Sequence, residues 1–216
     1  MAASPRVEPL REVLVLMGSA RREGNSARML PWLCEGIVEG AGDANLSVRT
    51  WWSYDLRVPA CDGDEACGVD GHCILRDAMT PLYDPLERAA GIVILSPIFF
   101  YGLPSSLKAL IDRCQAFWHR TARLGIPILP GYARPGALLA IGGAGGAKNF
   151  LGAELTARYF FDALQVRDFA THTFRGLDAP DDILAQPELE AAVRAIGRAY
   201  GQRVREALSA FAEPPQ

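Results

Sequence analysis

The chain has 216 residues, of which 50% are hydrophobic and 22% are charged. Those proportions are typical of a globular protein with a hydrophobic core, and they exclude a chain that is disordered throughout. The formal net charge of −3 gives no electrostatic reason to expect nucleic acid or an anionic membrane as a partner.

The expected compartment follows from the targeting signals that the sequence lacks. No segment approaches the roughly 20 continuous apolar residues of a membrane span. Residues 1–10 carry Pro and charges in place of an apolar signal core. We therefore expect a cytoplasmic protein, in which the five cysteines stay reduced unless a metal holds them.

Short apolar runs alternate with helical patterns along the first part of the chain. Residues 13–17 predict a first strand, and residues 46–52 predict a second. Between them, apolar residues recur at helical spacing over 29–38. Pro31 lies inside that pattern and lacks a backbone donor, so we expect a late helix start or a kink there.

An irregular insertion rich in Asp, Gly and Cys interrupts the alternation at about 55–77, and a short helix is predicted at 81–90. Residues 91–96 are the most strand-like run, and their continuous apolar character suits a parallel strand buried on both faces. The remaining predicted elements are a helix at 107–118, a strand at 137–141, a helix at 151–164, an edge strand at 166–173 and a long helix at 189–208.

This alternation predicts the fold class. Strands that alternate with helices form an α/β protein, here a doubly wound, five-stranded parallel sheet with helices on both faces. The sequence has no internal repeat and no linker, so we expect residues 1–216 to form a single domain that carries the cysteine insertion. In such sheets, ligands bind outside the carboxyl ends of the strands.

The first loop after a strand, residues 18–26, is suited to binding an anion. Its Gly, Ser and Asn residues let the backbone curl, and the helix N-terminal N–H groups that follow can donate to a phosphate. Arg21 or Arg22 can add positive charge. The alternative is a polar loop with a helix cap, because the loop matches neither a Walker A loop nor a strict G-x-G-x-x-G motif.

Two further loops have unusual compositions. Residues 96–104 place three aromatics directly after a buried strand, which suits the wall of a site for a flat ring; the alternative is that these aromatics cap the core. Residues 142–146 contain four glycines, so the backbone can approach a ligand closely; the alternative is a flexible turn. Together, the three loops suit a phosphorylated planar cofactor.

These loops resemble those of the flavodoxin-like NADPH-dependent FMN reductases, and specifically of their iron–sulfur flavoprotein branch. The resemblance covers roughly residues 12–175. It rests on Gly18-Ser19-x-Arg21-x-x-Gly24-Asn25-Ser26, on Ser96-Pro97-Ile98-Phe99-Phe100-Tyr101-Gly102 with Lys108, Asp112 and Arg113, and on Gly142-Gly143-Ala144-Gly145-Gly146.

The resemblance implies FMN as cofactor and assigns residues to it. The phosphate is held by Ser19, Arg21, Asn25 and Ser26. The ribityl chain and the isoalloxazine are lined by Pro97, Ile98, Phe99, Phe100, Tyr101 and Gly102. The other edge of the ring contacts Gly142, Gly143, Ala144, Gly145 and Gly146.

The implied activity moves electrons from NAD(P)H through FMN to a flavin, a quinone or another acceptor. The flavin performs this chemistry itself, so we assign no catalytic side chain. The implied partners are a nicotinamide nucleotide, a small-molecule or protein acceptor, and other copies of the chain in a homodimer or homotetramer. Two alternatives are a non-enzymatic FMN electron-transfer protein and a thiol or metal redox sensor module.

The cysteine insertion raises a separate question. The branch that this chain resembles carries a four-cysteine motif for a four-iron cluster, and the stretch Cys61-x-x-Asp64-x-x-Cys67-x5-Cys73 matches its spacing with Asp64 in place of the second cysteine. These residues could hold an iron–sulfur cluster with three Cys and one Asp ligand, or a zinc ion with His72 nearby. We prefer a third interpretation, a loop that has lost its cluster.

Other histidines and cysteines have ordinary structural interpretations. His119 follows the predicted helix end, where a helix C-terminal cation is a better interpretation than a substrate-binding group. His172 lies in a predicted strand and is interpreted as structural. Cys34 and Cys114 fall on helix faces directed at the core.

Overall fold

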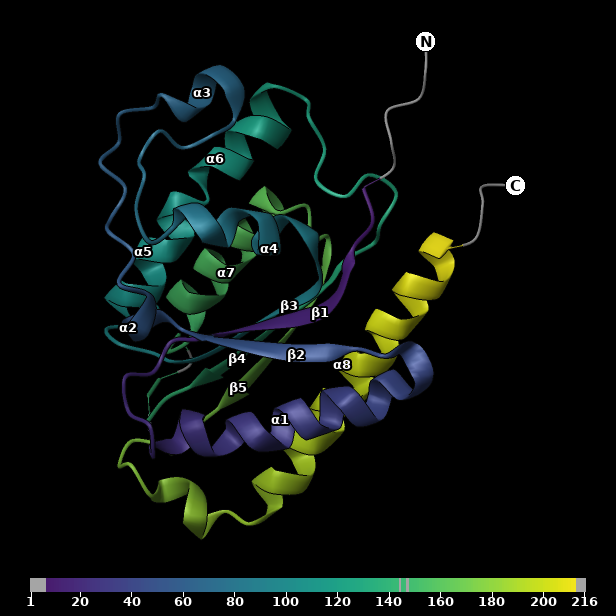
Figure 1. Ribbon diagram of the computed structural model, residues 1–216. Coiled ribbons are helices and arrows are strands. Elements are labelled where there is room, and N and C mark those ends of the chain that lie inside the picture. The colour runs from purple at the N-terminus through teal and green to yellow at the C-terminus, as the bar shows by residue number, and fades with distance from the viewer. Residues whose placement is uncertain (1–6, 144, 147, 213–216) are drawn as a thin grey trace.

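The computed structural model describes residues 7–143, 145–146 and 148–212 (Figure 1). The strands are β1 Leu10–Met17, β2 Ser47–Trp52, β3 Ala89–Pro97, β4 Pro135–Ile141 and β5 Asp168–Phe174. The longer helices are α1 Asn25–Ala41, α5 Ser105–Arg113, α7 Leu151–Ala163 and α8 Glu188–Ala212. The shorter ones are α2 Ser53–Leu56, α3 Cys67–Asp70, α4 Tyr83–Arg88 and α6 Gln115–Trp118.

The five strands form one sheet in the order β2-β1-β3-β4-β5, and every neighbouring pair is parallel. Strand β1, next to the edge strand β2, aligns Leu16 with Trp51 of β2 and with Ile94 of β3. The middle strands are almost wholly buried because both faces of the sheet are covered. This arrangement confirms the predicted doubly wound fold, with β5 at an edge.

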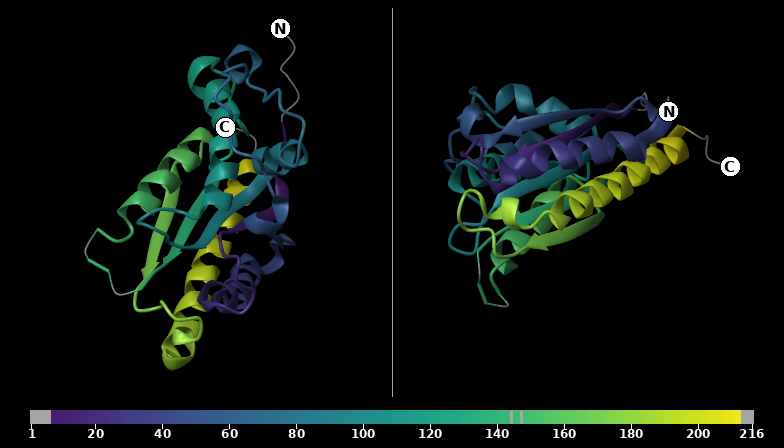
Figure 2. Two further views of the ribbon diagram at one scale, coloured as in Figure 1. Left: turned by 90° about the vertical axis from the view of Figure 1, so that its left-hand side faces the viewer. Right: turned by 90° about the horizontal axis from the view of Figure 1, so that it is seen from below.

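Two layers of helices enclose the sheet (Figures 1 and 2). Helices α1 and α8 lie along one face, and α4, α5 and α7 lie along the other. All five strands point the same way, so their carboxyl ends share one edge of the sheet. Among the described residues, no helix has the length and apolar character needed to cross a membrane.

Helices α1 and α8 are in backbone contact through glycines spaced four residues apart on each helix. A Cβ atom on Gly40 would lie 2.0 Å from the carbonyl oxygen of Arg198, and one on Gly201 would lie 2.1 Å from that of Ile37. Ion pairs flank the contact, among them Arg198 with Glu39 at 3.0 Å. This packing leaves no room for any side chain at either glycine.

Helix α1 begins at Asn25 and continues through Pro31 to Ala41, so a late start is wrong, while the alternative of a kink at Pro31 stays a prediction. The helix is anchored at its first turn by contacts of Asn25 and along its length by α8, and this tertiary packing outweighs the local cost of proline.

Replacing Pro31 with alanine is expected to raise the free energy of unfolding by about 1 kcal/mol. Alanine restores an N–H donor toward the carbonyl of Ala27, and Pro31 is exposed, so no packing is lost. Part of the gain is offset because proline also restricts the unfolded chain. Urea denaturation of the two proteins measures the difference, and a lower stability of the alanine variant would contradict the expectation.

The helix predicted at 107–118 is divided in the structure. Helix α5 ends at Arg113, α6 follows from Gln115, and one turn of π-helix continues over His119–Arg123. The carbonyl of Ile111 accepts from the N–H of Cys114 at 3.0 Å, a tighter bond than that of the α-helix. The division places Arg113 at the end of a helix, beside the cysteine insertion.

Candidate functional site

A cavity of about 300 Å³ opens at the carboxyl edge of the sheet, and we call it the loop cavity. Its size lies at the lower end of the range of small-molecule sites. The structure brings together there residues from all three predicted loops. The predicted residues that line it are Ser19, Arg21, Asn25, Ser26, Pro97, Ile98, Phe99, Gly142 and Gly143.

The first loop places the N-terminus of α1 at the loop cavity. Gly18 is required because a Cβ atom there would lie 2.2 Å from Oγ of Ser96. The backbone N–H of Arg21 donates to Oγ of Ser19 at 3.1 Å, which fixes the turn. Within the described residues, no side chain caps the first turn of α1, so its N–H groups are available to an anion.

The two arginines of this loop have different surroundings. The guanidinium of Arg22 lies 3.8 Å from the ring centroid of Trp52 and is paired with Asp55. Arg21 lines the loop cavity, and its guanidinium makes no ion pair within the described part of the chain. Arg21 is therefore the cation of this loop that can meet an anionic ligand.

Asn25 has a role that the sequence did not reveal. Its side-chain amide donates to the carbonyl of Ala179 at 2.8 Å, and its amide oxygen accepts from the N–H of Ile183 at 3.1 Å. Arg28 reinforces the link through an ion pair with Asp181 at 2.9 Å. Asn25 thus anchors the segment that follows β5 against α1, whereas the resemblance assigned it to a phosphate.

The second loop forms a tight aromatic turn. Phe99 and Gly102 exchange two backbone hydrogen bonds of 2.9 Å, and Phe100 and Tyr101 between them have φ values of +48° and +65°. Positive φ at both central positions is the geometry of a type I′ turn, and it is strained for aromatic residues. All three aromatics are exposed, Phe100 fully, so the interpretation that they cap the core is wrong.

The third loop enters the cavity with its first two glycines. A Cβ atom on Gly143 would lie 3.1 Å from the side chain of Asp178, so a larger residue would need Asp178 to shift by a few tenths of an ångström. Arg175 donates to the carbonyls of Gly145 and Gly146 at 3.1 and 3.2 Å and holds the rest of the loop. Ala144 lies outside the described residues.

The lining also includes residues that the sequence reasoning did not assign to the site, among them Tyr54, Leu177 and Asp178. They follow β2 and β5, whose carboxyl ends share the same edge of the sheet as those of the other strands. The sequence could have indicated these residues through their position after a strand, because their residue types alone do not indicate a binding site. The carboxylate of Asp178 adds a negative group to the wall of the cavity.

A second cavity, of about 390 Å³, lies beside the cysteine insertion, and we call it the thiol cavity. Its lining includes all four predicted metal ligands, Cys61, Asp64, Cys67 and Cys73. Burial raises the pKa of the Cys67 thiol, and Cys73, Cys61 and Asp64, each of which lies near Cys67, raise it further. Among the described residues, however, no three His, Cys, Asp or Glu side chains converge on a point as one metal ion requires.

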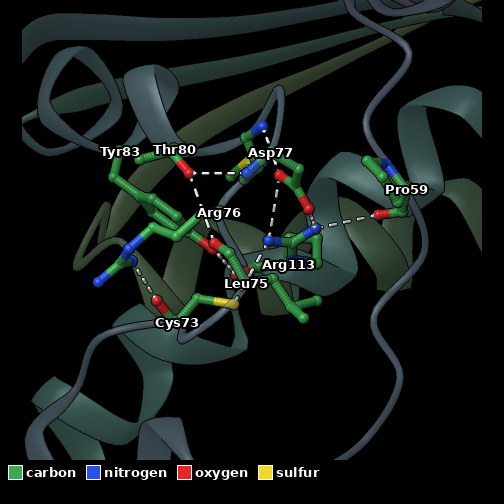
Figure 3. Close-up of polar contacts among 9 residues, drawn as sticks. Pro59, Cys73, Leu75, Arg76, Asp77, Thr80, Tyr83 and Arg113 are labelled. Carbon is green, nitrogen blue, oxygen red and sulfur yellow. Dashed lines mark hydrogen bonds and ion pairs between the residues drawn. The ribbon is translucent and has the colours of Figure 1, made fainter.

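Arg113 joins the two ends of the insertion (Figure 3). Its side chain is fully buried and donates to Asp77 at 2.7 Å, to the carbonyl of Pro59 at 3.3 Å and to Sγ of Cys73 at 3.4 Å. Burial lowers the pKa of Arg113, but the hydrogen bonds to Asp77 and Cys73 outweigh it and raise the pKa overall. The hydrogen bond from Arg113 lowers the pKa of Asp77.

His119 does not end a helix, so its interpretation as a C-terminal cation is wrong. It opens the π-helical turn, is buried, and lies against Gly68 of α3, where a Cβ atom would be 3.4 Å from its ring. Cys114 is buried in the core as predicted, and burial raises the pKa of its thiol. Cys34 is partly buried against the core, also as predicted.

Sequence similarity to known proteins extends over most of the sheet. The model of the NADPH-dependent FMN reductase family matches residues 11–175. An iron–sulfur flavoprotein of Archaeoglobus fulgidus is 24% identical over 110 residues, which cover 51% of this chain and 48% of that protein. One of Methanosarcina thermophila is 25% identical over 129 residues, which cover 60% of this chain and 62% of that protein. Each match thus spans less than two thirds of the relative's length.

Solved structures share the fold at low sequence identity. An FMN-dependent NADH-azoreductase from Bacillus anthracis, in complex with FMN, superposes with a TM-score of 0.65 at 16% identity, covering 90% of this chain and 99% of that one. An NAD(P)H:quinone oxidoreductase from Methanothermobacter marburgensis superposes with a TM-score of 0.58 at 15% identity, covering 89% and 96%. At these identities the likeness shows the fold alone.

Proposed function

Because the chain belongs to the NADPH-dependent FMN reductase family, we propose that it binds FMN in the loop cavity and moves electrons from NAD(P)H through it to an acceptor. The observation that carries the proposal is the composition of this one cavity. It combines an uncapped helix N-terminus, the unpaired cation of Arg21 and the close backbone of Gly142 and Gly143. The helix N-terminus and Arg21 suit an anionic group, and the exposed backbone of the two glycines suits the edge of a flat ring.

FMN is proposed to lie with its phosphate at the start of α1. Ser19, Arg21 and Ser26 line this part of the cavity, and N–H groups of the helix add their partial positive charge. The ring is proposed to lie between Phe99 with its neighbours and the glycine loop. Phe100 and Tyr101 do not line the cavity, so we propose that they contact the outer edge of the bound flavin.

The residues of the loop cavity bind and orient the flavin, and bound FMN supplies the capacity to accept a hydride and to pass electrons on. No side chain is assigned as a general acid or base. The proposed acceptor is a flavin, a quinone or another small molecule. Anaerobic mixing of the FMN-loaded protein with NADH or NADPH tests the donor half: bleaching of the flavin absorbance supports the proposal, and an unchanged spectrum with both nucleotides contradicts it.

Substitution of Arg21 by alanine is expected to weaken FMN binding by roughly 10- to 100-fold, the usual effect of losing a hydrogen bond to a charged group. Riboflavin lacks the phosphate, so its affinity is expected to stay within about twofold. Fluorescence titration with each ligand measures both. Arg22→Ala is the matched control, because Arg22 is held by Trp52 and Asp55. Equal losses for FMN and riboflavin would contradict the assignment of Arg21 to the phosphate.

The thiol cavity favours a second candidate, an electron-transfer protein that uses no nicotinamide. Two relatives of the chain are named iron–sulfur flavoproteins, names that combine a flavin with a second redox centre. Such a protein would keep FMN but would be reduced by a protein donor and by neither nucleotide. The anaerobic mixing experiment separates the two candidates.

Assembly into a homodimer or homotetramer is proposed as well. The outer face of α7 exposes apolar side chains in helical register, Leu151, Leu155 and Tyr159. They lie on the same element whose Gly152 contacts the carbonyl of Tyr101 in the aromatic turn. Light scattering coupled to gel filtration measures the mass, and a monomer at micromolar concentration would contradict the proposal.

A further inference from the structure

The segment that follows β5 passes beside the start of α1 and forms one side of the loop cavity, and we call residues 177–183 the strap (Figure 1). Its first residue is tied to the third loop, because the N–H of Leu177 donates to the carbonyl of Gly142 at 3.1 Å. Its middle is tied to α1, because the side-chain amide of Asn25 donates to the carbonyl of Ala179 at 2.8 Å. The strap thus bridges the two parts of the cavity that are proposed to hold the ring edge and the phosphate of FMN.

Asp178 places a carboxylate on the wall of the loop cavity. The backbone around it is fixed by Asp182, whose carboxylate accepts from the N–H groups of Asp178 and Ala179, each at 2.7 Å. The side chain of Asp178 lies against Gly143, where a Cβ atom would be 3.1 Å away. Among the described residues, this carboxylate makes no ion pair and accepts no hydrogen bond. It is therefore a positioned acceptor that can take a donor from a ligand.

The chemistry of a carboxylate indicates which part of a flavin nucleotide lies beside it. An ionised carboxylate accepts hydrogen bonds and donates none, so it selects ligand groups that donate. The phosphate is itself an anion and is repelled by a second negative charge. The chain between the phosphate and the ring carries hydroxyl groups, and each of them can donate. Asp178 belongs to the segment that bridges the two ends of the cavity, which is the place of this chain.

We propose that the carboxylate of Asp178 binds hydroxyl groups of the ribityl chain, and that Asn25 is the positioning residue that holds the strap, and with it Asp178, against α1. This inference rests on the proposed binding of FMN in the loop cavity. It gives Asn25 a role toward the strap in place of the phosphate. It also names the ligand class that the cavity recognises, flavins that carry a polyhydroxy chain.

Three flavins separate the contacts. FMN has the phosphate, the chain and the ring; riboflavin lacks the phosphate; lumiflavin lacks both the phosphate and the chain. Asp178→Ala is expected to weaken the binding of FMN and of riboflavin by a similar factor, about 10-fold, and to leave lumiflavin within about twofold. Fluorescence titrations measure all three, in about 0.15 M salt to screen the repulsion between Asp178 and the phosphate.

Glu188→Gln is the matched control. It removes an exposed carboxylate just beyond the strap that does not line the loop cavity, so all three affinities are expected to stay within about twofold. The pattern for Asp178→Ala also differs from that expected for Arg21→Ala, which weakens FMN alone.

Asn25 is tested in the same titrations. If it holds the strap, Asn25→Ala weakens FMN and riboflavin together, whereas a residue that binds the phosphate would affect FMN alone. Adding Asp178→Ala to this variant is expected to cause little further loss, because the two residues act on one contact. Circular dichroism checks that the variants fold, and Asn25→Ser, which keeps a hydroxyl at the start of the helix, replaces the alanine variant if that one does not.

The possible results separate this inference from the proposed function. An unaltered protein that binds none of the three flavins would contradict both. If it binds FMN but Asp178→Ala leaves the affinity for riboflavin unchanged, the inference alone is wrong. An equal loss for lumiflavin would place Asp178 at the ring or make it structural only, and tighter binding of FMN with riboflavin unchanged would mean that Asp178 only repels the phosphate; either result overturns the inference.

Discussion

Replacing Gly201 with valine is expected to lower the free energy of unfolding by at least about 3 kcal/mol, the upper range for overpacking a tight contact. A Cβ atom there would lie 2.1 Å from the carbonyl oxygen of Ile37 and 2.9 Å from the N atom of Ala41. Both are backbone atoms of α1, so no flexible side chain can move aside. The two helices must separate, and this exposes the core side chains beneath them.

Urea denaturation with circular dichroism measures this effect. Ala199→Val is the matched control, because it introduces the same side chain on the exposed face of α8 and is expected to cost less than about 1 kcal/mol. Similar stabilities for the two variants would mean that α1 and α8 are not in backbone contact.

The second large effect is expected at Arg113. Its replacement by methionine is expected to cost about 3 kcal/mol, because removing one partner of a buried ion pair leaves the other uncompensated. Among the described residues, the Asp77 carboxylate would keep the hydrogen bond from the N–H of Met79 alone, and Pro59 and Cys73 would lose their common anchor. The cysteine insertion is therefore expected to become sensitive to protease.

The same variant has a predicted pH dependence. Arg113 lowers the pKa of Asp77, so the pair stabilises the fold fully above the unfolded pKa of about 3.9 and loses that contribution as the pH falls toward the lower folded value. The stability difference between the two proteins should shrink below about pH 4. Arg76→Met is the control, since Arg76 is exposed and its side chain donates, within the described part of the chain, to the carbonyl of Cys73 alone. If Arg76→Met lowered the free energy of unfolding as much as Arg113→Met, that result would contradict the anchoring role of Arg113.

The architecture could be predicted from the sequence because buried parallel strands leave a plain signal. Residues 91–96 and 137–141 are continuous apolar runs, and both lie within the observed strands β3 and β4. The extents of the helices were harder to predict. Helix α1 passes through Pro31 because α8 and Asn25 hold it, and those contacts are distant in the sequence.

The loop cavity was predicted in part. The first loop, residues 18–26, and the first two glycines of the third loop lie together as expected, because all strands end at one edge of the sheet. Asp178 was not predicted, since a carboxylate after the last strand looks like any polar loop residue. The composition of the first loop did not distinguish Arg21 from Arg22; the family resemblance favoured Arg21, and the contacts of Arg22 with Trp52 and Asp55 of another segment agree with that choice.

The anchoring role of Arg113 was also beyond the reach of sequence reasoning. The apolar pattern of the helix predicted at 107–118 does not indicate that the guanidinium of Arg113 links Pro59 with Asp77. The link depends on the break between α5 and α6 and on the return path of the insertion, which are features of tertiary packing.

The proposed binding of FMN in the loop cavity is tested most directly by an absorption spectrum. The protein is purified without added flavin, its spectrum is recorded, and FMN is then titrated into the part that lacks it. We expect flavin bands in the purified protein, or saturable uptake of FMN to stoichiometry that Arg21→Ala weakens and Arg22→Ala does not. A folded protein with no flavin bands and no uptake of added FMN would contradict the account.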